Sequence, residues 1–330
     1  MKHIDITTMM KGCAMGIAEV IPGVSGGTIA FISGIYERLL AAIKSFDLKL
    51  LELLMKGKFK EAWMKADGWF LLSLISGMGV GIIAGVFIID YFLRNYPEPL
   101  WGFFFGLIIA SAFFVGKQIN QWNFRRILLL FAGFAVAFGI TMISPAEGNT
   151  SAWYIFLSGV IAISALILPG VSGSFMLLLM GMYTLIIPSL KHFLQVRDME
   201  SLSIISVFAA GCFVGLTGFS RIMSWLFNQY KSSTFIVLAG FLIGSLNKIW
   251  PWRNVSLYLD KNSGEIISLN DISVFNTLDT KTIRVISEVN VWPHDYIMSD
   301  PKALSTIVSL MIGFFLVFWF ERNSKPTPMD

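Results

Sequence analysis

Residues 22–26 read PGVSG and interrupt an apolar run that extends from residue 9 to residue 40. Inside a helix, proline and glycine cost roughly 3 and 1 kcal/mol relative to alanine, so a continuous helix through this stretch is unfavourable. A second PGVSG, at residues 169–173, divides the apolar run 153–190 in the same way. Each run is too long for one crossing of a bilayer, which takes about 20 helical residues. The pattern therefore predicts two broken segments, each made of two half-helices.

The composition of the whole chain is that of an integral membrane protein. Its 330 residues are 55% hydrophobic and 14% charged, with a mean hydropathy of +0.70, whereas soluble domains carry about 25% charged residues. An alternating strand pattern is absent, so we expect an all-α polytopic membrane protein. Six further apolar runs cover residues 69–92, 100–116, 127–143, 203–227, 234–246 and 303–320.

The two halves of the chain carry the same landmarks in the same order. Residues 12–36 align with residues 159–183, a shift of 147 positions that superimposes the two PGVSG stretches. Further along, Gly133 matches Gly313. Such self-similarity indicates an internal repeat. We expect a first unit at residues 1–150 and a second at residues 151–330, with a polar insertion at about residues 248–302.

The distribution of Lys and Arg predicts the topology. Residues 38–67 contain seven Lys and Arg and residues 144–152 contain none, and cytoplasmic loops carry the excess of positive charge. If each broken segment is re-entrant, each unit crosses three times and the second unit is inverted. We therefore expect two inverted-topology repeats, each with a broken re-entrant helix pair plus three transmembrane helices, cytoplasmic termini and an extracytoplasmic insertion. Lys191 and Arg197 would then lie outside, which argues weakly against this topology.

The broken segments are the candidate site. Backbone that leaves helical geometry in hydrocarbon must be buried in protein or line a wet cavity, and each following half-helix begins with free N–H groups and a partial positive charge. Two such ends meeting from opposite faces would bind an anion such as phosphate. The alternative is that the turns only permit tight packing. The candidate substrate-binding residues are Pro22, Gly23, Ser25, Gly26, Gly27, Thr28, Pro169, Gly170, Ser172, Gly173 and Ser174.

Glu19 precedes the first turn within an apolar run and is the candidate for coupling transport to a proton or cation. An ionisable group at that depth is a functional candidate by default, and its repeat counterpart is Leu166. The alternatives are an ion pair with Lys11 or a side chain that extends to the interface. Arg38 and Arg221 flank the apolar segments and are secondary candidates for guiding a phosphate, with membrane anchoring an equal alternative.

Other functions find no support in the residues. Cys13 and Cys212 lie in apolar segments without Cys-x-x-Cys spacing or a neighbouring histidine, so neither disulfides nor a metal site is expected. A His-Asp or Asp-rich cluster at membrane depth is lacking, so we expect no catalytic residue, no cofactor and no enzyme. The net charge of +4 comes from short loops beside the spans and does not indicate nucleic-acid binding.

Glu19 followed by PGVSGGT at residues 22–28, with the second copy PGVSGS at residues 169–174, resembles the DUF368 family of polyprenyl-phosphate transporters over nearly the whole chain. The resemblance implies a flippase that returns undecaprenyl phosphate, the lipid carrier of cell-wall precursors, to the inner leaflet of the bacterial plasma membrane. Ser174 stands where the first copy has Gly27, which narrows the second turn. A transporter of a small soluble anion, a lipid-phosphate enzyme and a scaffold protein are the alternatives, and a homo-oligomer is compatible with the sequence.

Overall fold

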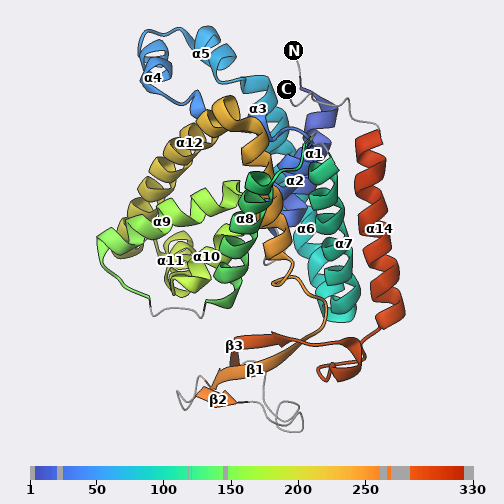
Figure 1. The fold of residues 1–330 in the computed structure, drawn as a ribbon. Helices are drawn as coiled ribbons and strands as arrows, with labels where there is room; N and C mark the ends of the chain where they lie inside the picture. The colour runs from blue at the N-terminus through green and yellow to red at the C-terminus, as the bar shows by residue number, and fades with distance from the viewer. Residues whose placement is uncertain are drawn as a thin grey trace.

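The computed structural model describes residues 4–20, 25–117, 119, 121–143, 148–260, 266–268 and 283–322, and most of them are helical (Figure 1). The first part of the chain forms α1 (Ile6–Glu19), α2 (Gly26–Ile32), α3 (Tyr36–Lys44), α4 (Leu48–Met55), α5 (Phe59–Lys65), α6 (Gly68–Asn95), α7 (Pro97–Lys117) and α8 (Phe124–Met142). The later part forms α9 (Ala152–Ile167), α10 (Gly173–Leu179), α11 (Tyr183–Val196), α12 (Met199–Ser245), β1 (Arg253–Asp260), β2 (Ile266–Ser268), β3 (Ile283–Asn290), the 3-10 turn η1 (Pro293–Asp295) and α14 (Ala303–Arg322).

Several helices are long and apolar enough to cross a membrane. Within the described ranges α6, α7, α8 and α12 meet this condition, and the bent pairs α2–α3 and α10–α11 would raise the number to six if each pair is one span. α12 has 47 residues, which at 1.5 Å per residue would extend about 70 Å, more than twice the thickness of the hydrocarbon core. It is broken at Tyr230, where φ is −135° and ψ is 44°. α12 therefore consists of two consecutive helices.

Each broken segment contains a further break that the sequence analysis did not predict. α2 and α3 are bent by 118°, and α10 and α11 by 111°. Gly34 and Gly181 stand at these bends with φ of +71° and +67°, a conformation that glycine adopts without steric cost. The expectation of two half-helices in each run is therefore wrong, because these left-handed glycines end α2 and α10 after seven residues and a third helix follows.

Glycines bring the long helices into backbone contact. A Cβ added at Gly77 would lie 2.0 Å from the carbonyl oxygen of Met9, so α1 and α6 touch directly. α9 and α12 are joined in the same way, since a Cβ at Gly211 would lie 2.1 Å from the carbonyl oxygen of Phe156. Small residues at helix interfaces permit this approach in membrane proteins.

Two further close pairs join the earlier part of the chain to the later part. Gly106 of α7 faces Leu310 of α14, where an added Cβ would lie 2.0 Å from the carbonyl oxygen. Gly240 of α12 faces Leu130 of α8, and a Cβ added at Gly240 would lie 2.2 Å from the Leu130 carbonyl oxygen. The helices before and after residue 150 are therefore interleaved, and each part supplies one helix to each pair.

The segment after α12 contains an antiparallel sheet in the order β2-β1-β3. The expectation of an all-α chain is corrected here. Val255, Leu257 and Leu259 alternate with more polar residues along β1, a two-residue period that the overall polarity of the insertion concealed. The sheet lies at the end of the helical bundle opposite to α4 and α5 (Figure 1).

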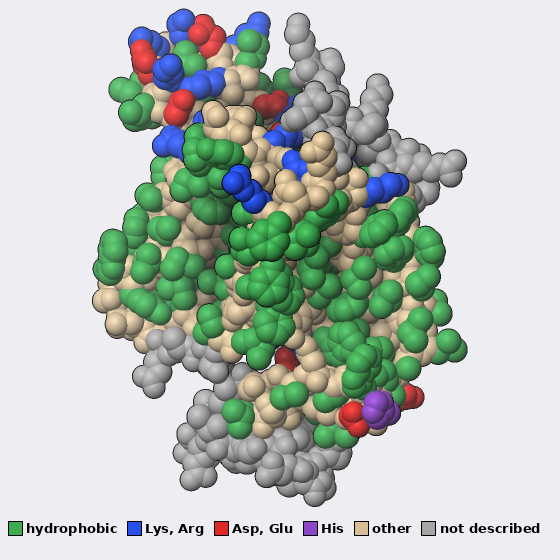
Figure 2. All heavy atoms as spheres, in the orientation of Figure 1, with side chains coloured by type: hydrophobic (Ala, Val, Ile, Leu, Met, Phe, Trp, Pro, Cys, Tyr) green, Lys and Arg blue, Asp and Glu red, His purple; other side chains and the backbone are tan. Residues whose placement is uncertain are grey.

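The outer surface matches a membrane environment. Figure 2 shows hydrophobic side chains across the middle of the face in view, most of the charged side chains toward the end where α4 and α5 lie, and a few acidic side chains at the opposite end. Large exposed side chains on the long apolar helices include Phe87 of α6, Phe131 of α8 and Phe213 of α12. A continuous apolar surface of this kind would promote aggregation in water and is stable in lipid. Figure 1 also shows that α1 begins and α14 ends toward the α4–α5 end.

Candidate functional site

Residues at and beside the two PGVSG stretches lie in contact. Ser25 Oγ donates a hydrogen bond of 2.9 Å to the carbonyl oxygen of Leu166, and the Gly170 N–H donates one of 2.9 Å to Thr28 Oγ1. Gly27 packs against the same region, where an added Cβ would lie 2.6 Å from the Leu166 oxygen. Hydrogen bonds therefore join the region of the first PGVSG stretch to the region of the second.

At the first turn, the side-chain hydroxyl of Ser25 caps the start of α2. Ser25 precedes α2, and its Oγ accepts a hydrogen bond of 3.1 Å from the Gly27 N–H. Ser25 and Thr28 are only 1% and 0% exposed, so their hydroxyls serve contacts within the protein. Pro22 and Gly23 lie outside the described residues.

Glu19 lies at the end of α1 and reaches the start of α2. Its Oε1 accepts a hydrogen bond of 2.6 Å from the Gly26 N–H. Lys11, the alternative partner considered from the sequence, donates instead to the carbonyl oxygen of Ser33 at 2.6 Å. The Glu19 carboxylate therefore occupies the position at which the first half-helix would meet an external anion.

The second turn is built differently. Ser172 Oγ lies 2.9 Å from Ser174 Oγ and accepts a longer hydrogen bond of 3.4 Å from the Phe175 N–H. Pro169 and Gly173 are buried, whereas Ser174 is exposed. Leu166 stands at the position that matches Glu19, so no carboxylate from α9 caps α10. The second turn thus keeps hydroxyl groups that are not used for joining the two turns.

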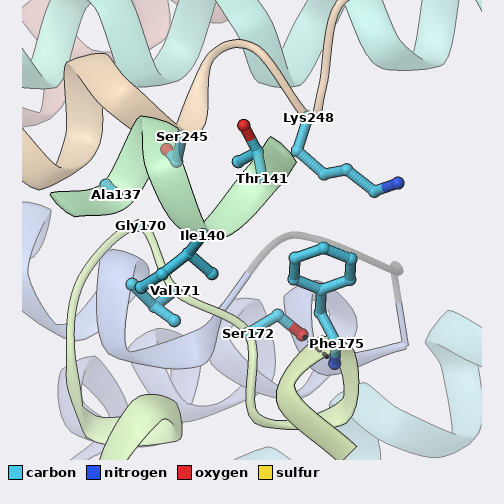
Figure 3. Close-up of a pocket in the computed structure, with 9 residues that line it drawn as sticks. All are labelled: Ala137, Ile140, Thr141, Gly170, Val171, Ser172, Phe175, Ser245 and Lys248. Carbon is cyan, nitrogen blue, oxygen red and sulfur yellow. Dashed lines mark hydrogen bonds between the residues drawn. The ribbon is translucent and has the colours of Figure 1, made fainter. Parts of the chain in front are cut away.

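A small pocket adjoins the second turn (Figure 3). It lies between this turn and the ends of α8 and α12, and it combines hydroxyl groups, one ammonium group and an apolar wall. The cavity has a volume of about 10 Å³, close to that of one water molecule, so it would have to widen to take a charged head group. The lining residues are Ala137, Ile140, Thr141, Gly170, Val171, Ser172, Phe175, Ser245 and Lys248.

Lys248 is a residue that sequence reasoning missed. It follows α12, at the boundary of the predicted insertion, and its Nζ lies 5.0 Å from the centroid of the Phe175 ring and 3.7 Å from Glu288 Oε2. Burial lowers the pKa of Lys248, and the nearby Glu288 carboxylate opposes this effect. A lysine after an apolar run is commonly a membrane anchor, so its sequence position carried no signal of the pocket.

The structure does not connect the two predicted arginines to the turns. Arg38 donates to both carboxylate oxygens of Asp67, at 2.6 and 3.0 Å, and lies 4.3 Å from the centroid of the Phe70 ring. Arg221 is exposed on α12. In the described part of the chain, neither arginine has a polar contact with either turn, and their role in guiding phosphate stays a prediction.

Metal ligation finds no candidate among the residues that the structure describes, because these contain no group of three or more His, Cys, Asp or Glu side chains suited to hold an ion. Cys13 and Cys212 are both free thiols.

The chain is similar to proteins that handle a lipid phosphate. A family model described as VCA0040-like, undecaprenyl phosphate translocase-like, matches residues 15–267. A polyprenyl-phosphate transporter of Vibrio cholerae is 41% identical over 264 residues, which cover 80% of this chain and 83% of that protein. A polyprenyl-phosphate transporter of Staphylococcus aureus is 29% identical over 265 residues, with 76% and 88% covered. Both relatives are named as transporters and not as enzymes. No solved structure matches the chain significantly.

Proposed function

The chain belongs to the VCA0040-like, undecaprenyl phosphate translocase-like family, and we propose that it returns undecaprenyl phosphate from the outer to the inner leaflet of the bacterial plasma membrane, where the carrier is reused for cell-wall synthesis. The observation that carries this proposal is the contact between the two turns beside the Ser172 pocket. A phosphate group cannot enter hydrocarbon without substitute donors. The pocket would hold the head group while the prenyl tail stays in lipid.

The proposed mechanism is alternating access between two inverted repeats, residues 1–150 and 151–330. Two observations support it. The bends of 118° and 111° occur at matching places in the two parts, and the glycine contact between α1 and α6 has its counterpart between α9 and α12. Because α7 packs on α14 and α8 packs on α12, the moving units would each combine helices from both parts of the chain.

The proposed topology places both termini in the cytoplasm and the sheet outside. It is supported by the positions of α4 and α5, which belong to the Lys-rich segment and lie at the end of the bundle opposite to the sheet (Figure 1). Cytoplasmic segments carry the excess of Lys and Arg. Labelling of an introduced cysteine in η1 and in α5 by a membrane-impermeant reagent would test it, with only the η1 cysteine expected to react in intact cells.

The proposal also includes coupling of transport to an ion through Glu19. While Glu19 is ionised, its carboxylate holds the Gly26 N–H. Protonation would weaken that hydrogen bond and free the start of α2 for the substrate phosphate. One proton would thereby be taken up as the head group moves to the first turn.

Reconstitution tests the function directly. We expect proteoliposomes containing the full chain to move undecaprenyl phosphate between leaflets faster than empty liposomes, and faster still with a pH gradient. Uptake of soluble phosphate without lipid movement would favour a soluble-anion transporter. Release of inorganic phosphate from the lipid would favour an enzyme.

A further inference from the structure

Two cations share one carboxylate at the edge of the Ser172 pocket. Glu288 Oε2 lies 2.8 Å from an Arg253 guanidinium nitrogen and 3.7 Å from Lys248 Nζ. Lys248 follows α12, Arg253 begins β1 and Glu288 lies in β3. The sheet therefore supplies both a cation and an anion to the region next to the second turn.

The cluster carries a net positive charge and is partly shielded from water. Two cations against one carboxylate leave one unit of positive charge, and the Arg253 side chain is only 12% exposed. Its guanidinium lies 4.8 Å from the centroid of the Trp101 ring, as the Lys248 ammonium lies over Phe175. Partial burial strengthens attraction to an anion, because screening by water is reduced.

We propose that Lys248 and Arg253 form the first docking point for the phosphate monoester of the substrate, and that Glu288 holds the two cations until the phosphate replaces it. This inference rests on the proposed function. Carboxylate and phosphate oxygens make the same hydrogen bonds to a guanidinium, so one group can take the place of the other. A phosphate monoester carries about 1.5 to 2 negative charges at neutral pH, against one on the carboxylate, so the exchange is favourable.

The pocket next to the cluster contains groups that could receive the substrate after docking. Ser172 lines the same pocket as Lys248, so a phosphate released by the cations would meet the hydroxyl of the second turn once the pocket widens. Ala137 and Ile140 of α8 provide an apolar wall for the first carbons of the prenyl chain. The extracytoplasmic sheet thereby acquires a role in substrate capture.

The test compares three variants of the full chain in proteoliposomes with undecaprenyl phosphate. Lys248→Gln is expected to raise the apparent KM about tenfold, because a charge-assisted contact is lost, while kcat changes less than twofold. Glu288→Gln is expected to lower KM about threefold, because the internal competitor is removed. Lys248→Arg should restore most of the affinity.

The matched control is Arg94→Gln, which removes an exposed cation on α6 that pairs with Asp90 and has a side chain 76% exposed. It is expected to change neither KM nor kcat. If Glu288 only braced the sheet, Glu288→Gln would lower the melting temperature and transport together, and that result would overturn the proposal. Unchanged KM in Lys248→Gln would overturn it as well.

Binding measurements separate this inference from the proposed function. Farnesyl phosphate and inorganic phosphate are titrated into the purified chain. Lys248→Gln is expected to weaken the binding of farnesyl phosphate about tenfold. Equal weakening of both ligands identifies a general phosphate site, and selective weakening of the prenyl ligand identifies a lipid site; both support the cationic docking point. Weakened binding together with absent lipid transport in the wild type would reject the function and retain the docking point. Lipid transport by the wild type together with unaltered ligand binding in Lys248→Gln would retain the function and reject the docking point.

Discussion

The two turns share the sequence PGVSG but have different surroundings. In the first, Ser25 and Thr28 are buried and their hydroxyls join the two parts of the chain. In the second, Ser172 is also buried but lines a pocket, and Ser174 is exposed. The comparison teaches that one five-residue sequence can take part in a joint or line a pocket, and that the neighbours of each copy decide which.

Three substitutions between the copies account for the difference. Gly27 packs against the Leu166 carbonyl, a place where the matching Ser174 would clash. Glu19 caps the first turn, and its counterpart is Leu166 itself. The third change replaces Thr28, which accepts from Gly170, with the pocket-lining Phe175. Each change shifts the first copy toward internal contacts and the second toward the pocket.

The largest expected effect comes from Gly27→Val. Its Cβ would lie 2.6 Å and 2.7 Å from two backbone oxygens, those of Leu166 and Ile167, which cannot move as a flexible side chain could. We expect a loss of about 1–3 kcal/mol or more in stability and no transport. Melting temperature in detergent is the measurement. Ser174→Val, at the exposed matching position, is the control and should melt within about 2 °C of the wild type, in line with surface substitutions.

Glu19→Gln is expected to have the next largest effect. Glutamine keeps an oxygen that can accept from Gly26 but cannot ionise, so the stimulation of transport by a pH gradient should disappear and the rate should fall at least tenfold. The initial rate of lipid movement with and without a gradient measures this. Undiminished stimulation in the variant would exclude Glu19 as the coupling group and leave it as a cap of α2.

Smaller effects are expected from Ser25→Ala and Ser172→Ala, which should distinguish the joining role of the first turn from the binding role of the second. Ser25→Ala loses the hydrogen bond to Leu166 and is expected to cost about 1 kcal/mol in stability. Ser172→Ala loses the weaker, 3.4 Å cap of α10 and is expected to cost less stability than Ser25→Ala, while it lowers lipid transport about fivefold because a hydrogen-bond donor to the phosphate is lost. Melting curves and transport rates for both variants provide the comparison. The opposite assignment of the two effects would reverse the roles of the turns.

The smallest effect concerns the helices that lead into the turns. Asp5 caps α1, and the hydrogen bond from the Thr8 hydroxyl, with those from backbone N–H groups, lowers the pKa of Asp5 below 3.8. Because the folded pKa is depressed, this stability is present above pH 3.8 and is lost as the pH falls through the folded value. Ser151 before α9 makes no such side-chain hydrogen bond. Melting in acid should therefore be less pH-dependent in Asp5→Asn than in the wild type, whereas Ser151→Ala should leave the pH dependence unchanged.

Several residues of the candidate site were predicted as candidates, and Lys248 was not. Ser25, Thr28 and Gly170 were candidates because a repeated helix break at membrane depth is unusual, and the structure brings them together. Lys248 was not, because a lysine after an apolar run also fits a simple anchor. The bends at Gly34 and Gly181 were missed as well, since a lone glycine in an apolar run is compatible with a helix.

By itself, the sequence determined that the chain is a membrane protein and that its two longest apolar runs are interrupted at PGVSG, and it predicted that the two parts are related. These properties follow from side-chain hydropathy and from the backbone limits of proline and glycine, which act over a few residues. Only the tertiary structure decided that Glu19 closes the first turn and that Lys248 reaches the second, because such contacts depend on how the chain reverses direction and on which helices pack together.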